Sequence, residues 1–141
     1  MKSFASVSRR VVLVDTGPLV AAIDRGDLHH EWARGVLPQL KGPVKTCEAV
    51  VAEALHLLDD APAGIAALRR ILARMEIMPV LRDDLDAVFS AVTSYAPRMD
   101  LADGCLVVLS ARCDGAVVIT TETKDFSSYR VPFGSPEGLF A

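Results

Sequence analysis

The sequence has 141 residues, of which 51% are hydrophobic, 23% are charged and 6% are aromatic. This length and composition indicate one globular domain and exclude a disordered chain. The net charge of −3 excludes a protein that binds nucleic acid through overall positive charge, although several acids gathered in one site would leave the rest of the molecule slightly positive.

The sequence favours neither a membrane protein nor a secreted protein, because Asp15 interrupts the apolar core that a signal after the arginines of SRRVVL would need. No apolar run is long enough to cross a membrane as a helix. Three cysteines, an odd number, argue against a disulfide framework. We therefore expect a cytoplasmic protein with reduced thiols and no membrane partner. We expect residues 1–10 to form a flexible N-terminal tail and residues 11–141 to form the single domain.

Predicted strands alternate with predicted helices along the chain. Apolar, β-branched runs predict strands at residues 11–15, 44–46, 76–81 and 116–120. Helical spacing of apolar residues predicts helices at residues 18–23, 29–40, 47–58, 62–74, 83–96 and 100–113. Thr46 is a candidate N-cap for the third of these helices. The alternation predicts an α/β fold, a three-layer α/β/α domain with a central parallel sheet.

Carboxylates follow two of the predicted strands. Asp15 ends the first strand and Glu122 lies just beyond the last one, so both should stand at the carboxyl edge of the sheet, where such folds bind ligands. Asp100 and Asp103 are three residues apart at the start of a helix and therefore share one face. Glu53 lies within a strongly apolar helix, where an unpaired carboxylate is costly.

Each of these acids also has a purely structural explanation. Asp15 could be a loop acid or a helix cap. Asp100 could be an N-cap with Asp103 as its partner in a capping box. Glu53 could lie on a narrow polar edge of its helix, and the acids after the last strand could be ordinary turn residues.

The acids taken together favour a metal site. Four or five carboxylates at one edge of a sheet would repel each other, and some would remain protonated, unless a cation joined them. Mg²⁺ and Mn²⁺ prefer oxygen ligands of this kind and are usually held by few carboxylates together with a substrate phosphate. The sequence therefore predicts metal-assisted hydrolysis of a phosphodiester.

Four segments in this order resemble the PIN-domain family: VLVDTGPLVAAI, the spacing from Thr46 to Glu53, MDLADGCLVVLSAR and VVITTETKDF. The resemblance extends from about Val11 to Phe126 and is closest to VapC-like toxins of type II toxin–antitoxin modules. It implies a Mg²⁺- or Mn²⁺-dependent ribonuclease that hydrolyses RNA, forms a homodimer and is held inactive by a cognate antitoxin protein.

The resemblance also implies a role for each matching residue. The predicted catalytic residues are Asp15, Glu53, Asp103 and Glu122. The predicted metal ligands are Asp15, Asp100, Asp103 and Glu122. The predicted accessory residues near the site are Thr16, Thr120 and Asp125.

The sequence departs from the family pattern at two positions. Glu122 stands where the family usually has Asp, and its longer side chain could reach a metal differently or only through water. Gly104 stands where Ala is usual, which costs about 1 kcal/mol inside a helix. The change at position 122 leaves open a catalytically weakened PIN-like module that binds RNA or protein. VVLVDTG also leaves open an aspartate-based phosphatase, although that family needs a second Asp where Gly17 stands.

Overall fold

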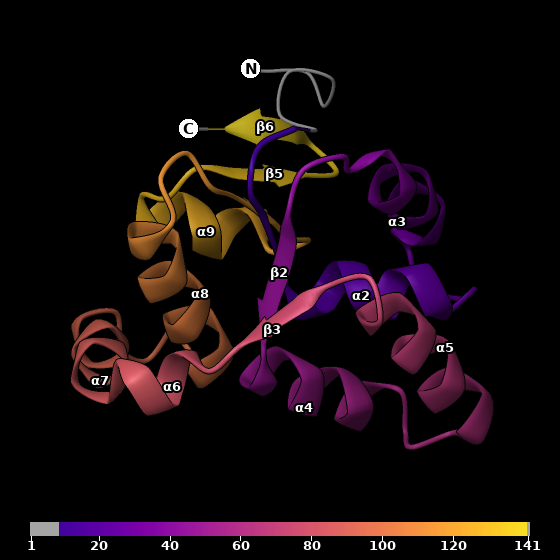
Figure 1. The fold of residues 1–141 in the computed structure, drawn as a ribbon, viewed down its shortest axis with the longest axis horizontal. Coiled ribbons are helices and arrows are strands. Elements are labelled where there is room, and N and C mark those ends of the chain that lie inside the picture. Colours follow the sequence, from indigo (N-terminus) through magenta and orange to yellow (C-terminus); the bar gives the residue numbers. More distant parts are fainter. Residues whose placement is uncertain (1–8, 141) are drawn as a thin grey trace.

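A computed structural model describes residues 9–140 and contains one six-stranded sheet in the order β3-β2-β1-β4-β5-β6 (Figure 1). The strands are β1 (Val12–Val14), β2 (Val44–Cys47), β3 (Glu76–Met78), β4 (Val117–Ile119), β5 (Phe133–Ser135) and β6 (Gly138–Phe140). β1 to β5 are parallel, and β6 pairs antiparallel with β5. The predicted α/β fold with a central parallel sheet is confirmed.

Helices cover both faces of the sheet. They are α2 (Thr16–Ile23), α3 (His30–Val36), the 3₁₀ helix η1 (Leu37–Gln39), α4 (Glu48–Leu57), α5 (Pro62–Leu72), α6 (Val80–Asp83), α7 (Leu85–Ser94), α8 (Leu101–Arg112) and α9 (Thr123–Tyr129). In Figure 1, α2, α3 and α5 lie on one side of the sheet, and α7, α8 and α9 lie on the other. This arrangement makes the three predicted layers.

The two central strands carry the core. Every residue of β1 and β4 is buried, as continuous apolar runs in a parallel sheet require when helices cover both faces. Their side chains pack with those of α8, whose Cys105, Leu106 and Leu109 are buried. Because β1 and β4 are adjacent and parallel, the residues that follow them meet at one edge of the sheet.

The segment after β2 differs from the sequence prediction. β3 ends at Met78, three residues before the predicted end of the strand, because Pro79 follows it as the N-cap of the short helix α6. Proline has no backbone N–H to donate to a neighbouring strand. The short helix α6 thus occupies the end of the predicted strand, and the predicted helix over residues 83–96 corresponds to α7. The chain after α8 also contains α9, β5 and β6, for which the sequence carries no clear periodic signal.

Thr46 does not cap a helix, which contradicts the prediction. It is the third residue of β2 and is completely buried, and its hydroxyl donates a hydrogen bond to the carbonyl oxygen of Val14 at 2.9 Å. The N-cap of α4 is Cys47, which makes no side-chain cap hydrogen bond. Thr46 therefore ties β2 to β1 just below the edge where Asp15 stands.

Two further expectations concern the whole chain. Within residues 9–140, no helix is long and apolar enough to cross a membrane. All three cysteines are free, with Cys47 and Cys105 buried. Most of the predicted N-terminal tail, residues 1–8, lies outside the described residues, so the tail and the cytoplasmic location both stay predictions.

Candidate active site

Asp15 stands at the carboxyl end of β1, as predicted, and is held by two donors. It is the N-cap of α2, and its Oδ1 accepts a hydrogen bond from the backbone N–H of Thr16 at 2.8 Å. Its Oδ2 accepts a hydrogen bond from Thr120 Oγ1 at 2.7 Å. Thr120 directly follows β4, the neighbour of β1. Only 3% of Asp15 is exposed, so its carboxylate has one fixed orientation.

The position of Asp15 has an electrostatic cost. Burial raises the pKa of Asp15 from the ordinary 3.8 to about 6. The hydrogen bonds from Thr120 and Thr16 act in the opposite direction, because they favour the ionised form. The negative charges of Glu53, from α4, and Asp100, just before α8, raise the pKa further. Carboxylates from separate helices therefore surround the end of β1.

Asp100 and Asp103 form a capping box at the start of α8. Asp100 Oδ1 accepts from the Asp103 N–H at 2.8 Å, and Asp103 Oδ2 accepts a longer bond from the Asp100 N–H at 3.5 Å. The structural explanation of this pair as a capping box is thus correct. It does not explain why Asp103 is buried, with only 8% of the residue exposed. Burial raises the pKa of Asp103 from 3.8 to about 7, and the charges of Asp15 and Asp100 contribute. Asp15 and Asp103 are therefore two buried acids that repel each other.

Glu53 belongs to the same group of acids. It is half-buried, and burial raises its pKa, with further contributions from the charges of Asp100 and Glu122. The nearby Thr16 hydroxyl lowers the pKa of Glu53, although Thr16 Oγ1 is itself buried without a partner in hydrogen-bonding geometry. Glu53 therefore does not occupy a separate polar edge of its helix.

Glu122 and Asp125 lie in different surroundings. Glu122 is exposed at the N-cap of α9, its N–H donates to Thr120 Oγ1 at 2.9 Å, and its charge raises the pKa of Glu53. Asp125 lies in the first turn of α9 with the Arg98 Nε 3.7 Å from its Oδ1. Asp125 is thus paired with a cation, whereas Glu122 joins the other carboxylates. We call these carboxylates the acid cluster: Asp15, Glu53, Asp100, Asp103 and Glu122.

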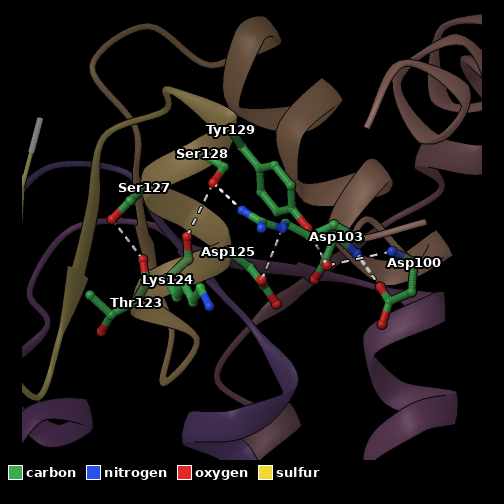
Figure 2. Close-up of polar contacts among 9 residues, drawn as sticks. Asp100, Asp103, Thr123, Lys124, Asp125, Ser127, Ser128 and Tyr129 are labelled. Carbon is green, nitrogen blue, oxygen red and sulfur yellow. Dashed lines mark hydrogen bonds and ion pairs between the residues drawn. The ribbon is translucent and has the colours of Figure 1, made fainter. Parts of the chain in front are cut away.

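Tyr129 is a residue of the site that sequence reasoning missed. Its hydroxyl donates a hydrogen bond to Asp103 Oδ2 at 2.9 Å, and Figure 2 shows the ring reaching from α9 to Asp103. Burial and the adjacent charge of Asp103 raise the pKa of Tyr129, so it remains a neutral donor. Tyr129 lies three residues beyond VVITTETKDF, the last segment that resembles the family, and no periodic pattern of apolar residues surrounds it, so sequence reasoning did not identify it.

Gly17 allows the first turn of α2 to approach the segment after β4 closely. A Cβ atom at position 17 would lie 2.0 Å from Thr121 Oγ1, far inside van der Waals contact. The aspartate-based phosphatase needs an acid at this position. The structure has no room for one unless Thr121 moves, which argues against that alternative.

The donor set fits a hard divalent cation. Within residues 9–140, no three His, Cys, Asp or Glu side chains are placed to enclose a metal ion by themselves. Mg²⁺, however, usually keeps several waters and needs only one or two carboxylates with a substrate phosphate. Asp15 and Asp103 supply two buried carboxylates whose repulsion a cation would remove. The chemistry of the donors therefore fits Mg²⁺ or Mn²⁺.

A groove of about 1120 Å³ lies between α2, α3 and α5, away from the acid cluster. It extends to Val44 at the start of β2, whereas the acids follow the carboxyl ends of the strands. Its lining combines apolar side chains with four arginines, namely Arg25, Arg34, Arg70 and Arg74, and with one acid, Glu31, whose Oε1 lies 3.9 Å from Arg34 Nη1. This groove therefore presents positive charge around apolar surface on a chain whose net charge is negative.

Residues 12–132 match the model of the PIN domain family, and no curated protein sequence matches the chain significantly. Among solved structures, VapC20 of Mycobacterium tuberculosis, described as a toxin that cleaves the sarcin–ricin loop, has a TM-score of 0.71 and 20% identity over 85% of this chain and 95% of that one. VapBC2 of Rickettsia felis, solved with a promoter DNA fragment, has a TM-score of 0.62 and 15% identity over 89% and 98%. FitAcB of Neisseria gonorrhoeae has a TM-score of 0.58 and 16% identity over 89% of this chain and 98% of that one. At these identities the likeness establishes the fold.

Proposed function

Because this chain belongs to the PIN-domain family, we propose that it is a Mg²⁺- or Mn²⁺-dependent ribonuclease that acts as the toxin of a toxin–antitoxin module. The observation that carries the proposal is the buried pair of Asp15 and Asp103, whose pKa values are both raised by burial and by neighbouring negative charge. Ionising these two carboxyl groups therefore lowers the free energy of unfolding of the protein. Perturbed acids of this kind are typical of functional sites.

In this proposal the role of each carboxylate of the acid cluster depends on how deeply it is buried. Asp15 and Asp103 would hold the cation, and the more exposed Asp100 and Glu122 would supply further carboxylate oxygens. A bound Mg²⁺ or Mn²⁺ supplies a polarising charge for the phosphate and lowers the pKa of an attacking water. Glu53 is half-buried between Thr16 and Asp100, and its raised pKa suits it to accept a proton from that water.

The accessory residues orient the ligands. The Thr120 hydroxyl holds Asp15 Oδ2, and the Thr16 backbone N–H holds Asp15 Oδ1. The unsatisfied Thr16 hydroxyl is a ready donor for a phosphate oxygen or a water in the site. Asp125 keeps Arg98 close to α9, so its contribution is to the position of a cationic side chain.

RNA cleavage by the purified full chain tests the activity. A mixed cellular RNA pool is incubated with Mn²⁺, with Mg²⁺ or with a chelator, and Asp103→Asn is compared with Asp86→Asn, an exposed acid in the first turn of α7. We expect discrete cuts that need metal, disappear in Asp103→Asn and persist in Asp86→Asn. Cuts that survive the chelator or Asp103→Asn would contradict the proposed site.

The proposed partner is a cognate antitoxin protein, and the groove between α2, α3 and α5 suits an acidic amphipathic segment of it. Apolar side chains would meet the apolar lining, and carboxylates would meet Arg25, Arg34, Arg70 and Arg74. We expect the product of the adjacent gene to bind, and Arg70→Glu with Arg74→Glu to weaken binding strongly. Arg82→Glu, an exposed charge on α6, is the control. Equal affinity for all variants would contradict this docking site.

We also propose that the chain forms a homodimer, as its resemblance to VapC-like toxins implies. Sedimentation of the free chain tests this proposal.

A weakened site is the second candidate, and the exposure of Glu122 favours it. An exposed carboxylate on a long side chain is less well oriented than the buried Asp15. Tight RNA binding without any cut, under both metals and with an RNA pool that includes ribosomal RNA, would support this binding module over the nuclease.

A further inference from the structure

Asp103 has two unequal oxygens. Its Oδ2 accepts a hydrogen bond from the Tyr129 hydroxyl at 2.9 Å and a longer one from the Asp100 N–H at 3.5 Å. Neither of these contacts involves Oδ1. One oxygen of this carboxylate is therefore engaged within the protein, and the other is available to a ligand.

The Tyr129 ring is held in place by aromatic packing. It is only 3% exposed. It makes edge-to-face contacts with Tyr95, at a centroid distance of 5.2 Å, and with Phe126, at 5.1 Å. Such contacts are geometrically specific and stabilise one orientation of the ring. The hydroxyl can therefore leave Asp103 only if the aromatic contacts break.

A second polar contact fixes α9 against the start of α8. The Arg98 guanidinium, two residues before Asp100, donates a hydrogen bond to Ser128 Oγ and lies 3.7 Å from Asp125. Figure 2 shows Ser128, Asp125 and Tyr129 on the same side of α9 as Asp103 and Asp100. The same helix has Glu122 as its N-cap. The helix α9 thus connects Glu122 with Asp103.

We propose that Tyr129 is a positioning residue of the acid cluster, whose hydroxyl holds Asp103 Oδ2 so that Oδ1 stays available to a divalent cation. The inference rests on the proposed function, because it concerns how that site receives its cation. Hydrogen bonds to the residues that hold a metal typically change metal affinity by about 10–100-fold. Neutral Tyr129 suits this task because it donates a hydrogen bond without adding charge.

The first test compares Tyr129→Phe with Tyr95→Phe. Both substitutions remove one hydroxyl from the same aromatic cluster, but only the first removes the hydrogen bond to Asp103. For the full chain we would measure Mn²⁺ affinity by calorimetry, the melting temperature without metal, and RNA cleavage. We expect Tyr129→Phe to weaken Mn²⁺ binding by about 10–100-fold and Tyr95→Phe to leave it unchanged. A purely structural role would lower the melting temperature without this selective loss of affinity.

The second test does not require Tyr129→Phe to fold. The chain has two tyrosines, so 3-fluorotyrosine incorporated into the Tyr95→Phe variant labels Tyr129 alone. We expect its ¹⁹F resonance to shift saturably as Mg²⁺ is added, and this shift to disappear when Asp103→Asn is introduced. The resonance reports the hydroxyl next to Asp103 and is independent of enzymatic turnover.

The outcomes separate this inference from the proposed function. If wild type binds Mn²⁺ and cuts RNA, but Tyr129→Phe binds equally well and the ¹⁹F resonance does not move, the role of Tyr129 is wrong and the nuclease stands. If wild type neither binds the metal nor cuts RNA, the proposed function fails and the inference fails with it. Selective loss of affinity together with a saturable shift supports the role of Tyr129, and metal-dependent RNA cleavage by wild type is needed besides to support the nuclease.

Discussion

The Thr120 hydroxyl donates a hydrogen bond to Asp15 Oδ2 at 2.7 Å, although the two residues are 105 positions apart in the sequence. The same hydroxyl oxygen accepts a hydrogen bond from the Glu122 N–H at 2.9 Å. Thr120 therefore fixes both Asp15 and the start of the segment that bears Glu122. Because β1 and β4 are adjacent parallel strands, this link lies at the edge of the sheet.

Replacing Thr120 tests the importance of this link. Thr120→Val removes the donor to Asp15 and the acceptor for Glu122 but keeps the shape of the side chain. We expect RNA cleavage to fall by about 10–100-fold, the usual effect of removing a residue that orients a ligand. Thr120→Ser keeps the hydroxyl and should retain most of the activity. A loss in Thr120→Ser as large as that in Thr120→Val would contradict this role, because the hydroxyl is kept in the serine variant.

Replacing Asp15 should separate activity from stability. Asp15→Asn keeps the size of the side chain and removes a buried charge whose pKa is raised by burial. We expect cleavage to fall by more than about 100-fold, beyond the usual effect of an orienting residue. The melting temperature of the metal-free protein above neutral pH should stay the same or rise. The control is Asp114→Asn, an exposed acid beyond α8. Retained RNA cleavage in Asp15→Asn would falsify the assignment of Asp15 as a catalytic residue that binds the metal.

The stability of the metal-free protein should fall as the pH rises. The pKa values of Asp15 and Asp103 are raised from 3.8 to about 6 and about 7 in the folded chain. Between about pH 4 and pH 7 the folded state therefore binds protons that the unfolded chain has released, and the free energy of unfolding decreases through this window. Each unit of pKa difference corresponds to about 1.4 kcal/mol.

Denaturant unfolding at a series of pH values measures this effect. Saturating Mg²⁺ should reduce the loss, because the cation favours the ionised carboxylates. The double variant Asp15→Asn with Asp103→Asn should lose most of the pH dependence in this range. A stability that increases between pH 4 and pH 7 and does not respond to the double variant would contradict the electrostatic account, whatever the protein's activity.

Gly104 should resist substitution by alanine. A Cβ at this position would lie 2.8 Å from Val92 Cγ2, where α8 packs against α7. We expect Gly104→Ala to lower the free energy of unfolding, because overpacking typically costs about 1–3 kcal/mol and exceeds the gain in helix propensity. Gly35→Ala in α3 is the matched control, because no atom lies within 4 Å of its added Cβ. It should stabilise the protein by up to about 1 kcal/mol. Equal effects in the two variants would show that α7 accommodates the methyl group.

Local sequence determined the elements around the acids. The apolar runs before Asp15 and Thr120 predict β1 and β4, and the spacing of apolar residues predicts α4 and α8 with Glu53 and Asp103 on them. Hydrophobic periodicity is a property of neighbouring residues, so it can be read without a structure. The parallel order then places the acids at one edge of the sheet.

Only the tertiary structure decided what each carboxylate contacts. The polar sequence TKDFSSY shows no helical pattern, yet α9 forms because Phe126 and Tyr129 are buried against the rest of the domain. This packing brings Tyr129 to Asp103 and places Asp125 beside Arg98. Burial, pKa and the orientation of an oxygen atom depend on groups that are distant along the chain, and no local pattern encodes them.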